Sequence, residues 1–185
     1  GGLGVDRGAA VILDDAGDLA RFERAELSFE EFDAQFSAET RAAGHEISGR
    51  DFVALLDVAL KPEMIEVLRR VKSAGLRAGC ITNNFEGLDP VRSERKAKGD
   101  AAIAAVLALF DHVIESSKAG VRKPEPRIYE MMLEALALPA SACVFLDDLG
   151  VNLKPAQAMG MHTIKVPFGD VRPAIDALSS TLGIA

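Results

Sequence analysis

The sequence predicts an α/β fold, with a Rossmann-like parallel sheet covered by helices on both faces and a small helical cap joined to it. From Lys61 onward, short apolar runs typical of buried strands alternate with helical segments of roughly ten residues. This alternation favours a parallel sheet. Between Leu19 and Leu60 the periodicity is helical instead. We therefore expect an uncertain N-terminal segment at 1–18, which is a remnant of or substitute for the first core strand, a helical cap at 19–60 and an α/β core at 61–185.

The cap carries two helix-start signals. Ser28 and Glu31 have the spacing of a capping box, which predicts a helix that continues to about Ala43. Ser48 and Asp51 form a similar, weaker start. Three phenylalanines at spacings of three and four could face a lipid tail or pack on the core, and the spacing favours packing: Phe29, Phe32 and Phe36.

The core follows in the order that its apolar runs dictate. The predicted elements are a helix over 64–71, a strand at 76–81, a helix at 92–110, a strand at 112–115, a helix at 127–136, a strand at 142–146, a short helix ending at Gly160, a strand at 163–166 and a helix starting near Val171. The run from Val11 to Leu13 predicts a further short strand that feeds a turn at Asp14.

Composition excludes several classes of protein. The formal charge of -7 and the pI near 5.0 come from scattered acidic residues, so no basic stripe is present for nucleic acid. Cys80 and Cys143 lack the C-x-x-C spacing of zinc sites and are interpreted as strand residues. No apolar run approaches the roughly 20 residues that span a bilayer. We expect a cytoplasmic protein without nucleic-acid or membrane partners; the sequence does not indicate an oligomeric state.

Polar residues follow the predicted strands, at the edge where open parallel sheets bind ligands. Thr82, Asn83 and Asn84 follow the strand at 76–81 and offer a hydroxyl and backbone amides, which are donors suited to a phosphate oxygen. Threonine and asparagine are also ordinary turn formers, so this triplet alone is a weak signal.

A lysine follows the next strand. Pro124 favours an extended backbone at Lys123 just before a predicted helix, which directs the lysine rather than leaving it in a mobile loop. Its ammonium suits the neutralisation of a phosphoryl group or the holding of a carboxylate. A solvated loop lysine is the alternative interpretation.

Two adjacent carboxylates, Asp147 and Asp148, come directly after the strand at 142–146. Like charges at this spacing are costly unless a cation joins them, and Mg²⁺ binds one or two protein carboxylates and keeps several waters. The alternative is that one aspartate only caps the helix that carries Pro155.

In chain order, the strings CITNN, SSKAGVRKPEPRIYE and VFLDDLGVNLKPAQAMGMHTI resemble the second, third and fourth motifs of the haloacid dehalogenase superfamily of hydrolases. The strings also resemble the phosphatase domain of soluble epoxide hydrolases and the similar domain of acyl-CoA dehydrogenase family member ten. It covers about residues 19–183, because ARFERAELSFEEF also resembles the helical cap of such enzymes.

The resemblance implies a magnesium-dependent phosphatase that acts on a small phosphate monoester. It assigns phosphate binding to Thr82 and the amide of Asn83, and a bridge between phosphate and nucleophile to Lys123. It further assigns Mg²⁺ to Asp148 with support from Asp147, and the steadying of the loop to Asn152. In this family an aspartate of the first motif attacks phosphorus, and water hydrolyses the resulting aspartyl-phosphate.

The first motif is the part of the pattern that fits least. Asp14 in VILDDAGDL takes the place of the nucleophile, but Ala16 stands where the usual second aspartate would be. Only nine residues separate Asp14 from Arg24, which leaves little room for the expected cap helix. The chain also opens Gly-Gly-Leu-Gly without a methionine. We therefore expect either that Asp14 is a working or vestigial nucleophile, or that the true first strand lies upstream.

Three other interpretations remain. A phosphoacceptor receiver domain also uses an early acidic pair, a central aspartate such as Asp57, a threonine and a lysine, but it needs a further strand where the sequence predicts helix. A non-catalytic relative used for binding or scaffolding fits the doubtful first motif. Dehalogenation is open to the same fold, although Thr82, Lys123 and the acidic pair suit a metal-bound phosphate better.

Overall fold

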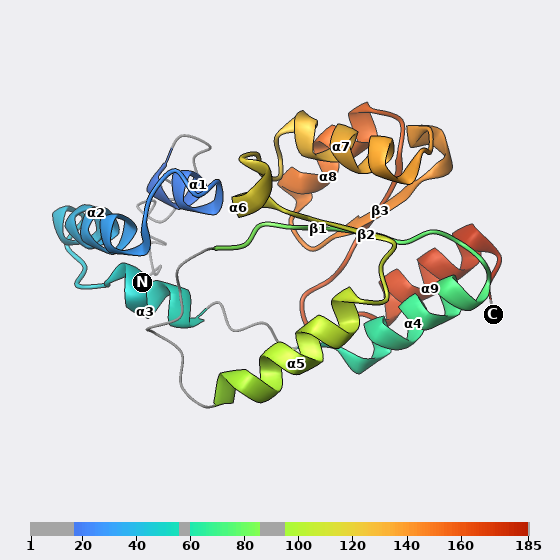
Figure 1. Ribbon diagram of the computed structural model, residues 1–185, viewed down its shortest axis with the longest axis horizontal. Helices are drawn as coiled ribbons and strands as arrows, with labels where there is room; N and C mark the ends of the chain where they lie inside the picture. Colours follow the sequence, from blue (N-terminus) through green and yellow to red (C-terminus); the bar gives the residue numbers. More distant parts are fainter. Residues whose placement is uncertain (1–16, 56–59, 86–94, 185) are drawn as a thin grey trace, which may run out of the picture. The chain divides into compact units, whose positions relative to one another are not determined.

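The computed structural model describes residues 17–55, 60–85 and 95–184, and Figure 1 shows the order of its elements. The chain divides into two compact units. Unit 1 consists of Gly1–Val58, Asn83–Arg92 and Ser116–Arg122, and unit 2 consists of Ala59–Thr82, Ser93–Glu115 and Lys123–Ala185. The predicted strand at 11–13, the candidate nucleophile Asp14 and the receiver-type Asp57 lie outside the described residues.

Unit 1 is helical in its described part. Its helices are α1 (Asp18–Glu23), α2 (Phe29–Ala42), α3 (Gly49–Leu55) and the short α6 (Ser116–Ala119). The predicted capping box opens α2, since Ser28 Oγ accepts from the Glu31 amide at 3.2 Å and Glu31 Oε2 accepts from the Ser28 amide at 2.8 Å. The helix start predicted at Ser48 is likewise present as α3. Helix α6 was not predicted, because four residues give no readable periodicity.

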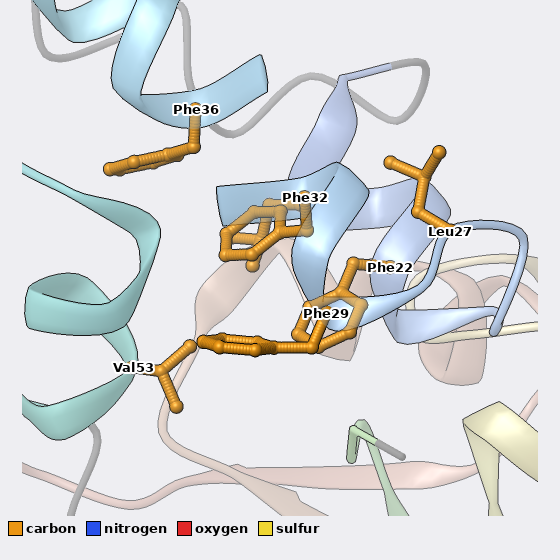
Figure 2. Packing of buried hydrophobic residues seen from close by; sticks show 7 residues of the cluster. Phe22, Leu27, Phe29, Phe32, Phe36 and Val53 are labelled. Carbon is orange, nitrogen blue, oxygen red and sulfur yellow. The ribbon is translucent and has the colours of Figure 1, made fainter. Parts of the chain in front are cut away.

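Aromatic side chains form the core of unit 1, as Figure 2 shows. Phe22 of α1 stacks on Phe32 of α2 at 4.6 Å between ring centroids and on Phe85 at 4.9 Å. Phe29, Phe32 and Phe36 are at most 3% exposed, which confirms the predicted packing role of the helix face that carries them. This cluster joins α1 to the segment that begins at Asn83.

Unit 2 contains two pairs of parallel strands. Strand β1 (Gly79–Thr82) pairs with β2 (His112–Glu115), and β3 (Val144–Asp147) pairs with β4 (His162–Lys165). Helices α7 (Pro126–Leu136) and α8 (Gly150–Ala158) lie on one side of the strands, and α4 (Pro62–Ser73) and α9 (Arg172–Leu182) lie on the other (Figure 1). The remaining helix of unit 2 is α5 (Arg95–Leu107).

The predicted α/β fold is confirmed, and the boundaries shift by a few residues. The strand expected from Leu76 starts at Gly79. The Leu76 amide still donates a hydrogen bond to the Val71 carbonyl at the end of helix α4. The strand expected to end at Leu146 includes Asp147. Cys80 lies on β1 as expected, whereas Cys143 lies between the 3₁₀ turn Ala140–Ala142 and β3; both are free thiols and half-buried. Pro155 is inside α8 rather than in its first turn.

The single sheet that the sequence predicts is present as two separate two-stranded sheets in the described residues. A largely apolar cavity of about 720 Å³ lies in unit 2, and residues 79–81 of β1 and 144–146 of β3 both line it. The two strands are not hydrogen-bonded to each other. The backbone ladder is therefore interrupted between β1 and β3.

The core of unit 2 is made by side chains from both layers of helices. Val67 and Val71 of α4 pack with Ile164 of β4 and with α9. On the α7 side, Ile128 and Tyr129 are completely buried. Among the residues that the structure describes, no helix is both long enough and apolar enough to cross a membrane.

Candidate functional site

The strand ends of unit 2 carry the polar residues that the sequence singled out. Thr82 is the last residue of β1 and pairs in register with Glu115, the last residue of β2. Asp147 is the last residue of β3 and pairs with Lys165, the last residue of β4. The carboxyl ends of parallel strands are where open α/β sheets bind their ligands. Thr82 and Asp147 therefore both lie at strand ends of the kind at which open α/β sheets bind ligands.

Lys123, which is partly buried, forms an ion pair with the buried Asp147. Lys123 Nζ donates to Asp147 Oδ2 at 2.8 Å, and the two side chains are 15% and 3% exposed. The solvated loop lysine that the sequence left open is therefore not what the structure shows. Within this environment the pairing fixes the direction of the lysine side chain, because losing it would leave a buried carboxylate without a cation.

The charge of Lys123 also acts on strand β1. Burial raises the pKa of the Cys80 thiol on β1, and the positive charge of Lys123 opposes that shift. A cation that acts on Cys80 while bonding to Asp147 lies within electrostatic range of both β1 and β3. Lys123 thus provides positive charge at the carboxyl end of β3, and this charge also acts on Cys80 of β1.

Asp147 receives further donors from its own loop. Its Oδ1 accepts from the Leu149 amide at 2.8 Å and from Asn152 Nδ2 at 2.9 Å. Asn152 is itself buried, and its carbonyl accepts from the Tyr129 hydroxyl at 2.7 Å. The sequence argument that adjacent carboxylates need a cation is thus met for Asp147 by Lys123. The carboxylate also bonds to residues at the start of α8, but the N-cap of that helix is Leu149 and no side chain caps it, so the capping alternative is wrong.

Asp148 differs from its neighbour because it is exposed. A hard cation such as Mg²⁺ takes one or two carboxylate oxygens and completes its shell with water, and an exposed aspartate beside a buried, oriented one fits that donor set. Within the described ranges, no group of three or more His, Cys, Asp and Glu side chains is arranged to hold a metal. A metal that needs an all-protein cage does not fit this loop, whereas a largely hydrated one does.

The segment after Thr82 belongs to unit 1, where hydrogen bonds hold it to the residues after β2. Asn84 Oδ1 accepts from the Ser117 amide at 3.2 Å and from Ser117 Oγ at 3.1 Å. The buried hydroxyl of Ser116 accepts from the Asn84 amide at 3.0 Å. These bonds fix the backbone that follows β1 to the backbone that follows β2.

Glu23 and Arg122 were not identified from the sequence. Glu23, the last residue of α1, forms a buried ion pair with Arg122 and accepts from Asn83 Nδ2 at 3.3 Å. One signal could have identified it, since Glu23 stands four residues after Leu19 and next to Phe22, on the apolar side of the helix. A charged residue at a core-facing helical position needs a partner.

The chain matches the haloacid dehalogenase-like hydrolase family over residues 7–160. It is 32% identical over 174 residues to acyl-CoA dehydrogenase family member 10 from Mus musculus, which covers 91% of this chain and 15% of that protein. It is 33% identical over 131 residues to bifunctional epoxide hydrolase 2 from Sus scrofa, covering 71% and 22%. It is also 30% identical over 123 residues to phosphatase MT3486 from Mycobacterium tuberculosis, covering 66% and 54%.

Solved structures show the same fold. A predicted HAD-like family hydrolase from Porphyromonas gingivalis superposes with a TM-score of 0.64 at 24% identity, covering 93% of this chain and 83% of that one. A family enzyme from Bacteroides thetaiotaomicron in complex with magnesium and inorganic phosphate superposes with a TM-score of 0.59 at 17% identity, covering 87% and 80%.

The chain spans between about a seventh and about half of the length of the relatives named above. The family match nevertheless extends over most of the chain and includes Thr82, Lys123 and Asp147. It leaves the receiver-type interpretation without support. The chain belongs to the haloacid dehalogenase-like hydrolase family.

Proposed function

We propose that this chain belongs to a magnesium-dependent phosphatase that hydrolyses a small phosphate monoester through an aspartyl-phosphate. The observation that carries the proposal is the 2.8 Å ion pair between Lys123 and Asp147, which stands beside the exposed carboxylate of Asp148. A phosphoryl-transfer centre needs a positive charge for the phosphoryl oxygens and a carboxylate that holds this charge in place. The printed name of one relative, a phosphatase, agrees with this chemistry.

Phosphate recognition falls to the ends of β1 and of the loop after β2. The Thr82 hydroxyl and the Asn83 amide donate hydrogen bonds to phosphoryl oxygens, and the Lys123 ammonium neutralises their charge. The ion pair with Asp147 keeps Lys123 from turning to solvent before substrate binds. Donors oriented in advance do not need to reorganise during the reaction, and this preorganisation is a large part of electrostatic catalysis.

Asp148 is the proposed metal ligand, and Asp147 supports it. Asp147 accepts bonds from Lys123, Leu149 and Asn152, and it therefore acts chiefly by holding the loop. Mg²⁺, when bound, neutralises charge on the phosphoryl group. A structure of one fold relative contains magnesium together with inorganic phosphate, which fits this donor set.

The nucleophile is proposed to lie at the end of one additional strand. A strand in the 720 Å³ cavity that residues of β1 and β3 line would complete the predicted parallel sheet. Its carboxyl end would then lie among the ends of the neighbouring strands. Asp14, which follows the apolar run Val11–Leu13, is one candidate, and an aspartate upstream of Gly1 is the other.

In this reaction the carboxylate attacks phosphorus, and the bond from phosphorus to the leaving alcohol breaks as the alcohol oxygen takes up a proton. Water then attacks the aspartyl-phosphate, which releases inorganic phosphate and regenerates the carboxylate. Dividing one difficult displacement into two steps is the usual advantage of covalent catalysis.

The test is hydrolysis of a generic aryl phosphate by the full-length protein, with and without Mg²⁺. We expect magnesium-dependent release of phosphate, and we expect Asp148→Asn to lower kcat/KM by at least ~100-fold. Asp14→Asn separates the two nucleophile candidates, because only a working Asp14 makes that change abolish turnover. A wild-type protein without turnover would support the alternative of a non-catalytic binding or scaffold protein.

A further inference from the structure

The last residue of helix α1 carries a buried acidic side chain. Glu23 is 9% exposed, and its Oε2 pairs with Arg122 Nε and accepts from Asn83 Nδ2 at 3.3 Å. The Arg122 and Glu23 side chains are 12% and 11% exposed, respectively. All three residues belong to unit 1. A buried carboxylate without its cation is strongly unfavourable, so Glu23 and Arg122 constrain each other.

Asn83 and Arg122, which both bond to Glu23, are the immediate chain neighbours of two proposed phosphate-binding residues. Asn83 follows Thr82, and Arg122 precedes Lys123. At both peptide bonds the chain passes from one unit to the other. The Glu23 carboxylate therefore bonds next to both of these peptide bonds, 82–83 and 122–123, which are about 40 residues apart in sequence.

A second contact from the same helix end acts on the first of these crossings. Phe22, the residue before Glu23, stacks on Phe85 with 4.9 Å between ring centroids and 15° between ring planes. Phe22 and Glu23 thus both contact the segment after β1, the first through ring stacking and the second through a hydrogen bond. The Asn84 bonds to Ser116 and Ser117 restrict the same segment from another side.

We infer that Glu23 is a positioning residue, which holds Asn83 and Arg122 and thereby fixes the backbone next to Thr82 and next to Lys123, two residues proposed to bind phosphate. The inference rests on the proposed phosphatase function and extends it to a residue of α1. A positioning role predicts a specific loss of phosphate recognition, whereas a merely structural role would weaken all parts of the site alike. Loss of the carboxylate should loosen phosphate recognition, while Asp147 keeps its Leu149 and Asn152 donors and the metal-binding loop stays in place.

The experiment compares Glu23→Ala and Glu23→Gln with Glu26→Ala in the full-length protein. Glu26 is a matched control because it lies three residues away and pairs with Arg24 at 2.7 Å, but its side chain is 47% exposed. We expect Glu23→Ala to lower kcat/KM for an aryl phosphate by about 10- to 100-fold, since small misplacements of binding groups have effects of this size. The Mg²⁺ concentration for half-maximal activity should stay unchanged, and Glu26→Ala should match wild type.

Hydrogen exchange gives a readout that does not depend on turnover. Glu23→Ala should speed exchange in segments 82–85 and 121–124 together, whereas Glu23→Gln, which keeps an acceptor for Asn83, should speed it mainly in segment 121–124. The inference would be overturned if both Glu23 variants exchanged at the rates of Glu26→Ala. It would also be overturned if Glu23→Ala raised the Mg²⁺ concentration for half-maximal activity by the same factor by which it lowered kcat/KM. A wild-type protein without turnover would refute the proposed phosphatase, and the exchange result would still decide the role of Glu23.

Discussion

Arg122 and Lys123 are consecutive residues, yet their side chains enter two different buried ion pairs in two different units. Lys123 pairs with Asp147 in unit 2, and Arg122 pairs with Glu23 in unit 1. The side chains are buried to a similar degree, with exposures of 15% and 3% in the first pair and 12% and 11% in the second. The pairs differ in how their carboxylates are held.

Asp147 receives two of its three donors from residues at most five positions away, Leu149 and Asn152. Glu23 accepts from residues 60 and 99 positions away, Asn83 and Arg122. The first carboxylate is therefore oriented in large part by its own loop. The second is oriented by contacts of the tertiary structure. This difference predicts unequal responses when each pair is broken.

The largest effect is expected from Lys123→Met compared with Arg122→Met. Methionine keeps much of the apolar stem of either side chain and removes the charge. Lys123→Met should lower kcat/KM by at least ~100-fold, because it removes the cation that we propose neutralises the phosphoryl group. It should also destabilise unit 2 by about 3–5 kcal/mol, because Asp147 stays buried without a cation. Arg122→Met should lower kcat/KM by only about 10-fold, since it acts through position.

Steady-state kinetics with an aryl phosphate and urea unfolding measure these two quantities. An equal loss of activity in both variants would break the comparison, since Arg122 would then act on the substrate as directly as Lys123. Unchanged stability of Lys123→Met would show that Asp147 depends on Leu149 and Asn152 alone.

An intermediate effect is expected from Asn152. Asn152→Ala removes one donor from Asp147 and leaves the backbone carbonyl that accepts from Tyr129, so it should cost about 1–3 kcal/mol of unfolding free energy. Asn152→Asp keeps the shape but places a second carboxylate against Asp147, and it should be more destabilising at neutral pH. Urea unfolding at pH 7 measures both. If Asn152→Asp were the milder change, the local network would not be what orients Asp147.

The contrast between the two pairs also explains what the sequence could reveal. Three polar residues of the site lie within six positions after an apolar run: Asp147, Asp148 and Asn152. The rule that ligands bind at the carboxyl ends of strands therefore identifies them without knowledge of the fold. Lys123 was recognised because Pro124 constrains its backbone. Each of these signals is local in the chain, and local patterns survive in a single sequence.

Glu23 carries only the weaker signal of its place on the apolar side of α1, and Arg122 carries none, because their pairing is a contact across 99 residues. A glutamate at the end of a short helix is usually a solvated residue, and an arginine in a loop equally so. The same limit affects the sheet, whose strands were predicted as one set although β1 and β3 do not pair in the described residues. Periodicity predicts that strands exist, but it does not say which strands are neighbours.

The smallest effect is expected at the capping box of α2, which is local and lies on the surface. Ser28→Ala should lower the melting midpoint by about 2–4 °C and leave phosphatase kinetics unchanged. Hydrogen bonds from the backbone and side chain of Ser28 lower the pKa of Glu31 below its usual value. This contribution to stability is present above the unfolded-state pKa of Glu31 and is lost as the pH falls through the lowered folded-state pKa.

The melting difference between wild type and Ser28→Ala should therefore be constant near neutral pH and shrink as the pH falls below about 4.5. Thermal unfolding followed by circular dichroism from pH 7 to pH 3 measures it. The paired variant Glu31→Gln retains an acceptor for the Ser28 amide but cannot titrate, so its difference from wild type should shrink over the same range. A difference that instead grew with acidification would mean that the ionised carboxylate of Glu31 does not strengthen this cap.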